Sequence, residues 1–378
     1  MITILGIAAV VLLFLLVFYI AKTSELASLI KGGDAKDEYE QTSSYQGGLS
    51  LAFLVLFFLA IGVSAYVWGP RMLPESASAH GIETDSMFQV TFWFTFIVFV
   101  LTHIALFWYT FRYRYKKDKQ AAYITHNNTL EVIWTLIPAV VMVILVVKGI
   151  NTWQYIFKTE NVTTASESME IKAVAKQFGW IIWYPGADGT FGKQIFDQEH
   201  VSPENELGID WSDPASHDDL IYVDKLYLVK EKPVLMKLGA QDVLHSFFLP
   251  HFRVKMDCVP GTPTQFPFTP LYTTAEYRER IKHQRYWAET DPETGTPRYE
   301  NFNFELACTE LCGKSHYAMQ KDVVVMTQEE YDAKMAELTP YYELVVAPDM
   351  ADEAGSDESD EATASDEDET TDVITELR

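Results

Sequence analysis

The sequence predicts a membrane-anchored all-β protein: four transmembrane helices, then a β-sandwich or barrel. Two observations indicate this fold class. About 20 apolar residues suffice to cross a bilayer as a helix, and four apolar runs of about that length fall early in the chain, at about 2–20, 49–69, 88–111 and 131–149. From residue 166 onward, short apolar stretches alternate with turns rich in Gly, Pro and Asp, which is typical of sandwiches and barrels.

This pattern divides the 378 residues into three parts. We expect a transmembrane region over 1–150, a β domain over 151–345 and a tail over 346–378. The first apolar run has no basic residues before it, is longer than the apolar part of a signal peptide and lacks an Ala-x-Ala cleavage site. We therefore expect it to stay in the protein as a helix.

The orientation follows from a cluster of basic residues after the third apolar run: Arg112, Arg114, Lys116, Lys117 and Lys119. Lys and Arg concentrate in cytoplasmic loops, so the fourth helix leads outward. We expect a multi-pass protein of a bacterial-type plasma membrane. Its β domain would lie on the periplasmic side, its N-terminus outside, residues 21–48 in a polar cytoplasmic loop and residues 69–87 in a short external loop.

The formal charge is −24, and half of it comes from the C-terminal tail. From Asp349 to Arg378 there are thirteen acidic residues and one Arg, a balance of −12. So few large apolar residues predict disorder. The tail has two interpretations: it keeps the protein solvated, or it attracts a basic partner. No nucleic-acid partner is expected for a chain of this charge.

Five segments of the third part are predicted strands: Glu170–Ala175, Tyr222–Val229, Pro233–Leu238, Phe302–Leu306 and Val323–Met326. Residues 273–298 are polar, partly compatible with a helix, and look like an insertion. The last two predicted strands flank a twelve-residue motif, Cys308 to Met319, and Gly313 follows its second cysteine. We therefore place the motif on a loop held by a sheet, where metal ligands are often found.

The motif contains two thiols, one imidazole and one thioether: Cys308, Cys312, His316 and Met319. These ligands suit copper and do not suit a hard cation such as magnesium. A mononuclear blue-copper site uses one Cys, whereas a second Cys allows two thiolates to bridge two metals. Without a metal, the two thiols could instead form a disulfide outside the cytoplasm. A second imidazole is available at His245, 63 residues before Cys308, although an isolated His is more often structural.

Several stretches together resemble subunit II of cytochrome c oxidase. They are Cys-x-Glu-x-Cys-Gly-x-x-His-x-x-Met over 308–319, Asp-Val-Leu-His-Ser-Phe over 242–247, Leu130–Pro138, Gln177–Trp180 and Lys255–Gly261. The match extends from about residue 88 to residue 326. The resemblance implies a cupredoxin-like β-barrel that holds a dinuclear copper centre, CuA.

The resemblance also implies roles for single residues. Cys308 and Cys312 would bridge the two coppers, and His245 and His316 would each complete one of them. Met319 and the backbone carbonyl of Glu310 would be the weak ligands. The side chain of Glu310 would help to bind a Mg or Mn ion shared with subunit I.

Three further residues have two interpretations each. Glu131 matches the mouth of a proton-uptake path in the family, but an acidic residue at a helix N-terminus also complements the helix dipole. Phe178 stands where the family usually has the Trp through which electrons enter, and Trp180 lies two residues on. Both aromatic residues are candidates for that role, and core packing is the alternative for each.

Other features depart from the family pattern. Residues 1–70 contain two helices with no counterpart in a minimal subunit II, and we expect them to pack against another subunit. Cys258 replaces a small residue and is expected to be a buried free thiol. His103 is expected to be a hydrogen-bonded structural residue rather than a haem ligand.

The resemblance implies a subunit through which electrons from cytochrome c reach the haem of subunit I, where dioxygen is reduced to water and protons are pumped. Its partners would be subunit I, other oxidase subunits, membrane lipid and a soluble or membrane-bound cytochrome c. Four alternatives stay open: a quinol oxidase subunit II, which lacks the copper ligands, an accessory subunit of a nitric oxide reductase, a copper-storage or assembly module, and a zinc protein that uses Cys308, Cys312, His316 and His245.

Overall fold

The computed structural model describes residues 2–30, 35–158, 168–195, 197, 200–203 and 205–346, without the side chains of residues 2–10, 28, 29 and 35. The predicted tail over 346–378 therefore lies outside the described residues except for Val346. The chain forms two compact units, Met1–Pro74 with Asp85–Thr152, and Glu75–Thr84 with Trp153–Arg378. Each is described by itself.

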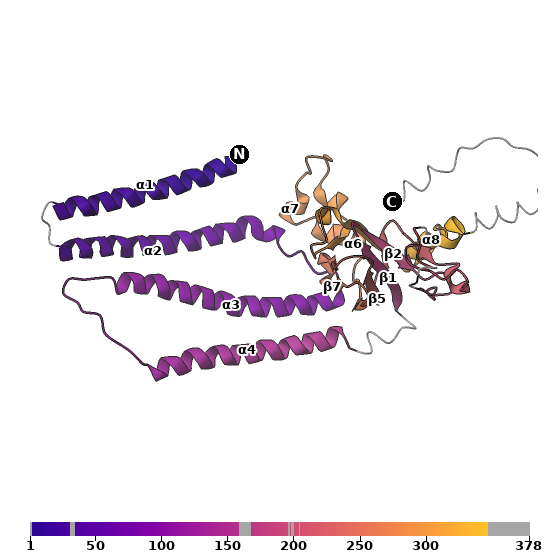
Figure 1. Ribbon diagram of the computed structural model, residues 1–378, viewed down its shortest axis with the longest axis horizontal. Coiled ribbons are helices and arrows are strands. Elements are labelled where there is room, and N and C mark those ends of the chain that lie inside the picture. The colour runs from indigo at the N-terminus through magenta and orange to yellow at the C-terminus, as the bar shows by residue number, and fades with distance from the viewer. Residues whose placement is uncertain are drawn as a thin grey trace, which may run out of the picture. The chain divides into compact units, whose positions relative to one another are not determined.

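Long helices make up the first unit: α1 (Ile2–Ile30), α2 (Ala35–Trp68), α3 (Ala79–Arg112) and α4 (Asn128–Ile156) (Figure 1). Among the described residues, three helical segments are long and apolar enough to cross a membrane: Lys36–Arg71, Ala79–Arg112 and Asn128–Ile156. The sequence predicted four spans. The predicted span over 2–20 lies in α1, which is not one of the three, and the side chains of its first residues lie outside the description.

The predicted polar loop over 21–48 is wrong, because the described residues of this segment, 21–30 and 35–48, are helical. Lys22 and Glu25 form an ion pair of 2.7 Å one turn apart in α1. The polar first half of α2 is held by the chain after α3, since Lys117 Nζ lies 2.6 Å from Asp37 Oδ1 and the Tyr115 N–H donates to Ser43 Oγ over 2.9 Å. The predicted external loop over 69–87 is also shorter than expected, because α3 already begins at Ala79.

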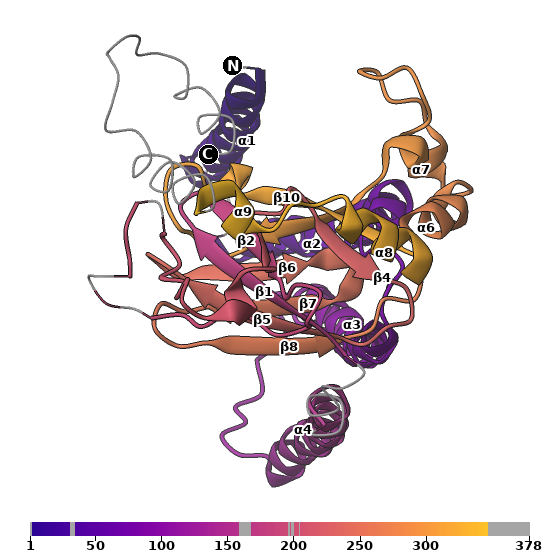
Figure 2. The same cartoon turned by 90° about the vertical axis from the view of Figure 1, so that its right-hand side faces the viewer.

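The second unit contains two five-stranded sheets (Figure 2). The order in one sheet is β3 (Leu220–Ile221), β2 (Gly179–Tyr184), β1 (Met169–Lys176), β5 (Val234–Ala240) and β8 (Thr264–Phe268). In the other it is β4 (Leu226–Val229), β10 (Gln320–Met326), β9 (Phe304–Cys308), β6 (His245–Leu249) and β7 (Val254–Cys258). The β1–β5 and β4–β10 pairs are parallel, and the others are antiparallel.

The five predicted strands overlap β1, β4, β5, β9 and β10, but residues 222–225 and 302–303 are not part of a strand. Tyr222 has a φ of 60°, so the chain turns there and β4 begins only at Leu226. Strands β2, β3, β6, β7 and β8 are not among the predicted strands. The description all-β is also too strict, because the unit contains α6 (Thr274–Ile281), α7 (Arg285–Ala288), α8 (Gln328–Ala336) and α9 (Tyr341–Val345). Short 3-10 turns occur at Gly69–Arg71, Pro214–Ser216, Pro250–Phe252, Arg298–Asn301 and His316–Ala318.

Alternation along the strands builds the main core between the two sheets. In β1 every second residue is buried, beginning with Met169, because successive side chains of a strand point to opposite faces. One cluster of buried residues draws on both sheets, including Ile171, Ile182, Met236, Phe247, Leu249, Phe304, Leu306 and Val323. A smaller cluster contains Ile181, Trp183, Leu207, Ile209 and Ile221. Strand β2 contributes to both clusters, so it is apolar on both faces.

The segment between α2 and α3 is part of the second unit. The Ala77 N–H donates to the His251 carbonyl over 2.7 Å, and the Leu271 N–H donates to the Ala77 carbonyl over 2.8 Å. Ser78 is fully buried, and its Oγ donates to the Phe252 carbonyl over 2.6 Å. Helix α3 therefore begins in the second unit, and the end of α4 belongs to it again.

His251 should make this unit sensitive to acid. Its ring lies 5.0–5.6 Å from those of Tyr277, Phe302 and Phe304, and burial, followed by repulsion from Arg253, lowers its pKa to about 4. An unfolded His titrates near pH 6.5, so the stability contributed by the neutral ring is complete above about pH 6.5 and is lost as the pH falls toward 4. We expect a loss of about 1–3 kcal/mol, because one pKa unit corresponds to about 1.4 kcal/mol.

The measurement is thermal unfolding of the full chain in detergent across this pH range. His251→Phe should flatten the acid limb, and the control His217→Phe, at an exposed site, should not. Equal acid limbs in the parent and His251→Phe would contradict this assignment.

Candidate metal centre

Pairing between β6 and β9 brings three metal-binding side chains together. His245 begins β6, Cys308 ends β9, and Phe247 pairs with Cys308 in the register of the two strands. The imidazole of His245 and the thiols of Cys308 and Cys312 are buried, and their ligand atoms all lie within 4.8 Å of one another. Within the described part of the chain, this is the one group of three or more His, Cys, Asp and Glu residues with such geometry.

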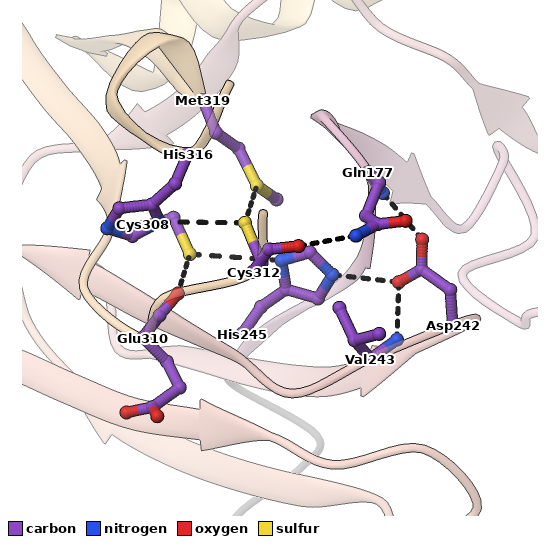
Figure 3. Close-up of polar contacts among 9 residues, drawn as sticks. All are labelled: Gln177, Asp242, Val243, His245, Cys308, Glu310, Cys312, His316 and Met319. Carbon is purple, nitrogen blue, oxygen red and sulfur yellow. Dashed lines mark hydrogen bonds and ion pairs between the residues drawn. The ribbon is translucent and has the colours of Figure 1, made fainter. Parts of the chain in front are cut away.

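The twelve-residue motif is the connection between β9 and β10, as predicted. The Cys308 N–H donates to the Met319 carbonyl over 3.2 Å and closes the base of the loop. Within it, a 3-10 turn over His316–Ala318 returns the chain to Cys312. The Cys312 Sγ then lies 3.5 Å from His316 Nδ1 and 3.9 Å from Met319 Sδ (Figure 3).

The other thiol has a matching pair of neighbours. The Cys308 Sγ lies 3.8 Å from His245 Nδ1 and 3.2 Å from the Glu310 carbonyl oxygen. Each thiol therefore has one imidazole nitrogen and one weak donor beside it. The structure thus brings together all six donors that the sequence analysis named.

The chemistry of the two thiols and their neighbours indicates which metal this group fits. All three cysteines of the chain are free. Burial, and next the negative charge of Cys308, raises the pKa of the Cys312 thiol to about 11. Two neighbouring thiolates in a buried site need a cation, and a bound metal ion deprotonates a coordinating thiol outright. Two sulfurs, two imidazoles and a buried thioether form a donor set that fits copper.

Asp242 orients one of the imidazoles. The His245 Nε2–H donates to Asp242 Oδ1 over 2.8 Å, which leaves Nδ1 with its lone pair toward Cys308. Burial opposes ionisation of Asp242, but hydrogen bonds from His245, Gln177 N–H and Val243 N–H hold its pKa below the usual value. The side chain of Gln177 donates to the Cys312 carbonyl. Neither Asp242 nor Gln177 is predicted to have a role from the sequence, although an Asp three residues before a ligand His is a signal for one.

The two aromatic candidates both lie beside the centre, but at different depths. The Trp180 side chain is 5% exposed, and its ring centroid lies 6.5 Å from that of His245. Phe178 is 38% exposed. Its ring packs against the loop, because a Cβ built on Gly313 would lie 3.0 Å from Phe178 Cζ. Phe178 therefore reaches both the surface and the loop, whereas Trp180 is enclosed.

The remaining candidates lie apart from the thiols. The Glu310 side chain is exposed and points away from the sulfurs (Figure 3). Glu131 is exposed in the first turn of α4, and it belongs to the first unit. Cys258 pairs with His245 in the register of β6 and β7. It is a fully buried free thiol, as predicted, and burial raises its pKa to about 12.

Comparison with known proteins gives two matching family models. The model of the transmembrane domain of cytochrome c oxidase subunit II matches residues 65–151, and the model of the periplasmic domain matches residues 169–275. The second match ends before the twelve-residue motif.

The alternative cytochrome c oxidase subunit 2 of Bradyrhizobium diazoefficiens is 31% identical over 282 residues, which cover 74% of this chain and 89% of the relative. The cytochrome c oxidase subunit 2 of Cereibacter sphaeroides is 28% identical over 251 residues, 63% of this chain and 72% of that relative. The crystal structure of the periplasmic domain of subunit II of cytochrome oxidase from Bradyrhizobium japonicum covers 45% of this chain and 92% of its own, with 23% identity and a TM-score of 0.28.

Gly313 should be required for the geometry of the loop. It has a φ of 138°, and an added Cβ would lie 3.0 Å from both Gln177 Nε2 and Phe178 Cζ. We expect Gly313→Ala to weaken metal binding by about tenfold, because it displaces the residues that support the ligands. A titration of the full chain against a competing chelator measures this effect. Gly189→Ala is the matched control, since Gly189 also has a positive φ but open space around its Cβ. Equal affinities in the two variants would contradict the prediction.

Proposed function

The chain belongs to the cytochrome c oxidase subunit II family, and we propose that it is the subunit through which electrons enter such an oxidase. It accepts electrons from cytochrome c at a dinuclear copper centre and passes them to the haem of subunit I. There dioxygen is reduced to water, coupled to proton pumping. The observation that carries this proposal is the pair of buried thiols, each with one imidazole and one weak donor beside it.

The six donors have the following roles. Cys308 and Cys312 would hold both metal ions through their thiolates, His245 and His316 would each supply one nitrogen, and Met319 and the Glu310 carbonyl would be the weak ligands. When bound, two coppers joined by two thiolates supply a one-electron relay, because the electron is shared and little geometry changes on reduction. The presence of all six donors argues against a quinol oxidase subunit, which lacks them.

The protein holds the six donors rigidly and excludes water from them. His245 is fully buried, Met319 is 1% exposed, and both cysteines are buried. Strands β6, β9 and β10 fix the two ends of the loop by backbone hydrogen bonds. A site held in this way changes little when the charge changes, and water is kept from the sulfurs.

Electrons enter through Phe178 rather than Trp180. Only the first of the two rings is exposed enough to contact a partner, and it also packs on Gly313, which follows the ligand Cys312. Exposed apolar side chains of Val243, Leu244, Leu311 and Tyr317 occur close in sequence to the ligands. The acidic balance of the chain favours a basic cytochrome c as donor, and the acidic tail is either part of that attraction or a solvating segment.

Two carboxylates extend the site toward the catalytic subunit. The exposed side chain of Glu310 is free of the thiols and would bind the Mg or Mn ion shared with subunit I. Glu131, in the first turn of α4, would stand at the mouth of a proton-uptake path.

The chain is membrane-anchored, with an extracytoplasmic C-terminal domain. We propose further that α1 is a fourth span, which places the N-terminus outside a bacterial-type plasma membrane. The two extra helices, α1 and α2, would then pack against another oxidase subunit.

Changes to single ligands test the copper assignment. With copper bound to the full chain, His245→Asn or Met319→Leu should distort or abolish the visible spectrum and leave the fold largely intact, because each removes one donor from a preformed site. His217→Asn, at an exposed His that contacts the Trp211 carbonyl, is the control. A spectrum and reduction potential unchanged in both ligand variants would show that the ligand set is wrong.

The route of electron input is tested by kinetics. Phe178→Ala should slow reduction of the assembled oxidase by cytochrome c by about tenfold, the effect typical of an exposed aromatic residue central to an interface, without changing the copper spectrum. Trp180→Phe should have little effect, since Trp180 does not reach the surface. Stopped-flow rates at fixed ionic strength measure both. The opposite ranking would assign the input to Trp180.

A further inference from the structure

We propose that Gln177 and Asp242 form a positioning pair that locks the two halves of the metal site together and sets its affinity and reduction potential. This inference rests on the proposed function only in naming copper as the metal. Three segments that are far apart in the sequence meet at this pair: the β1–β2 turn, the start of β6 and the β9–β10 loop.

The pair makes a continuous set of hydrogen bonds across the site (Figure 3). Asp242 Oδ1 accepts from His245 Nε2 over 2.8 Å, and Asp242 Oδ2 accepts from the Gln177 N–H over 2.7 Å. The Gln177 side-chain amide then donates to the Cys312 carbonyl. His245 beside one thiol and Cys312 itself are therefore connected through two side chains that bind no metal.

Each contact restrains a different degree of freedom of the site. The carboxylate fixes the ring of His245 and keeps the proton on Nε2, which raises the basicity of Nδ1 as a ligand. The amide of Gln177 fixes the peptide that follows the Cys312 thiol. That peptide leads into Gly313, whose φ of 138° is a conformation that other residues rarely adopt. Without the amide, the loop has less to hold it at its second cysteine.

The position of the pair also connects the site to the surface. Phe178 directly follows Gln177 and packs on Gly313, so the aromatic contact and the restraints on His245 and Cys312 share one short turn. Asp242 itself is partly exposed, with 32% of its side chain accessible, whereas the His245 side chain is fully buried. Changes at Gln177 or Asp242 could therefore also affect docking of a partner protein. Copper affinity, reduction potential and thiol alkylation need no cytochrome c, so they measure the positioning role alone.

The experiment compares Asp242→Asn, Gln177→Ala, Gln177→Glu and the double variant Asp242→Asn/Gln177→Ala in the full chain. Two controls match them: Asp188→Asn, where Asp188 accepts from the Thr190 N–H over 2.7 Å, and Gln241→Ala, where Gln241 Nε2 donates to the Glu206 carbonyl over 3.0 Å. Copper affinity, reduction potential and the EPR hyperfine pattern are measured in each. Alkylation rates of the thiols are measured in the reduced, metal-free chain.

We expect the variants of the pair to bind copper about 10–100-fold more weakly, the range typical of lost partners of metal-ligating His. Asp242→Asn should raise the reduction potential, because a less basic His245 stabilises the oxidised centre less. Gln177→Ala and Gln177→Glu should speed alkylation several-fold by loosening the loop, and the double variant should be less than additive because the two residues act through one set of bonds.

The positioning role would be overturned if copper affinity, reduction potential and thiol alkylation rate in these variants equal those of the parent. Changes no larger than those in the two control variants would overturn it as well. If the parent binds no copper, the proposed function fails, and the alkylation rates still decide on the pair. A variant that shows no thermal unfolding transition is not folded and is left out of the comparison. The remaining variants of Gln177 and Asp242 then decide the result.

Discussion

The arrangement of this site depends on two thiols that lie side by side where water is excluded. Burial raises the pKa of Cys312, and the neighbouring Cys308 adds to the effect. Such a pair is stable either as neutral thiols or as thiolates around a cation. The surrounding residues fit the second state, because His245, His316, Met319 and the Glu310 carbonyl place nitrogen, sulfur and oxygen atoms that can bind a cation beside the two sulfurs.

The β-sandwich is what brings these donors into contact. Two neighbouring strands, β6 and β9, carry one imidazole and one thiol, and the β9–β10 loop adds the remaining donors within twelve residues. The β1–β2 turn then supplies Gln177, which supports the loop through the Cys312 carbonyl, and Phe178, which packs on Gly313. Ligand geometry, the supporting hydrogen bonds and the exposed aromatic ring are thus consequences of one set of strand pairings.

The loop could be predicted from the sequence because its donors are close together and its spacing is specific. The approach of His245 to Cys308 does not follow from local spacing, because it depends on pairing between strands, and the two residues are 63 positions apart. Strand β2 was missed because Trp180–Tyr184 is buried along its whole length and shows no alternation. Helix α6 lies in the stretch 273–298, which the sequence predicts to be partly compatible with a helix, whereas α8 is not predicted; capping boxes of Thr273 with Glu276 and Thr327 with Glu330 begin the two helices. The polarity of residues 21–48 predicts a loop, but the described residues of this segment are helical, and the polar start of α2 contacts the chain after α3.

The central claim is that the two thiols bridge two copper ions, and metal content combined with EPR tests it most directly. The full chain, loaded with copper, is expected to contain two coppers per chain, to be purple with near-infrared absorption, and to show a multi-line hyperfine pattern from one unpaired electron shared by both ions. A colourless, EPR-silent protein loaded with zinc, or the hyperfine pattern of a single copper, would contradict it.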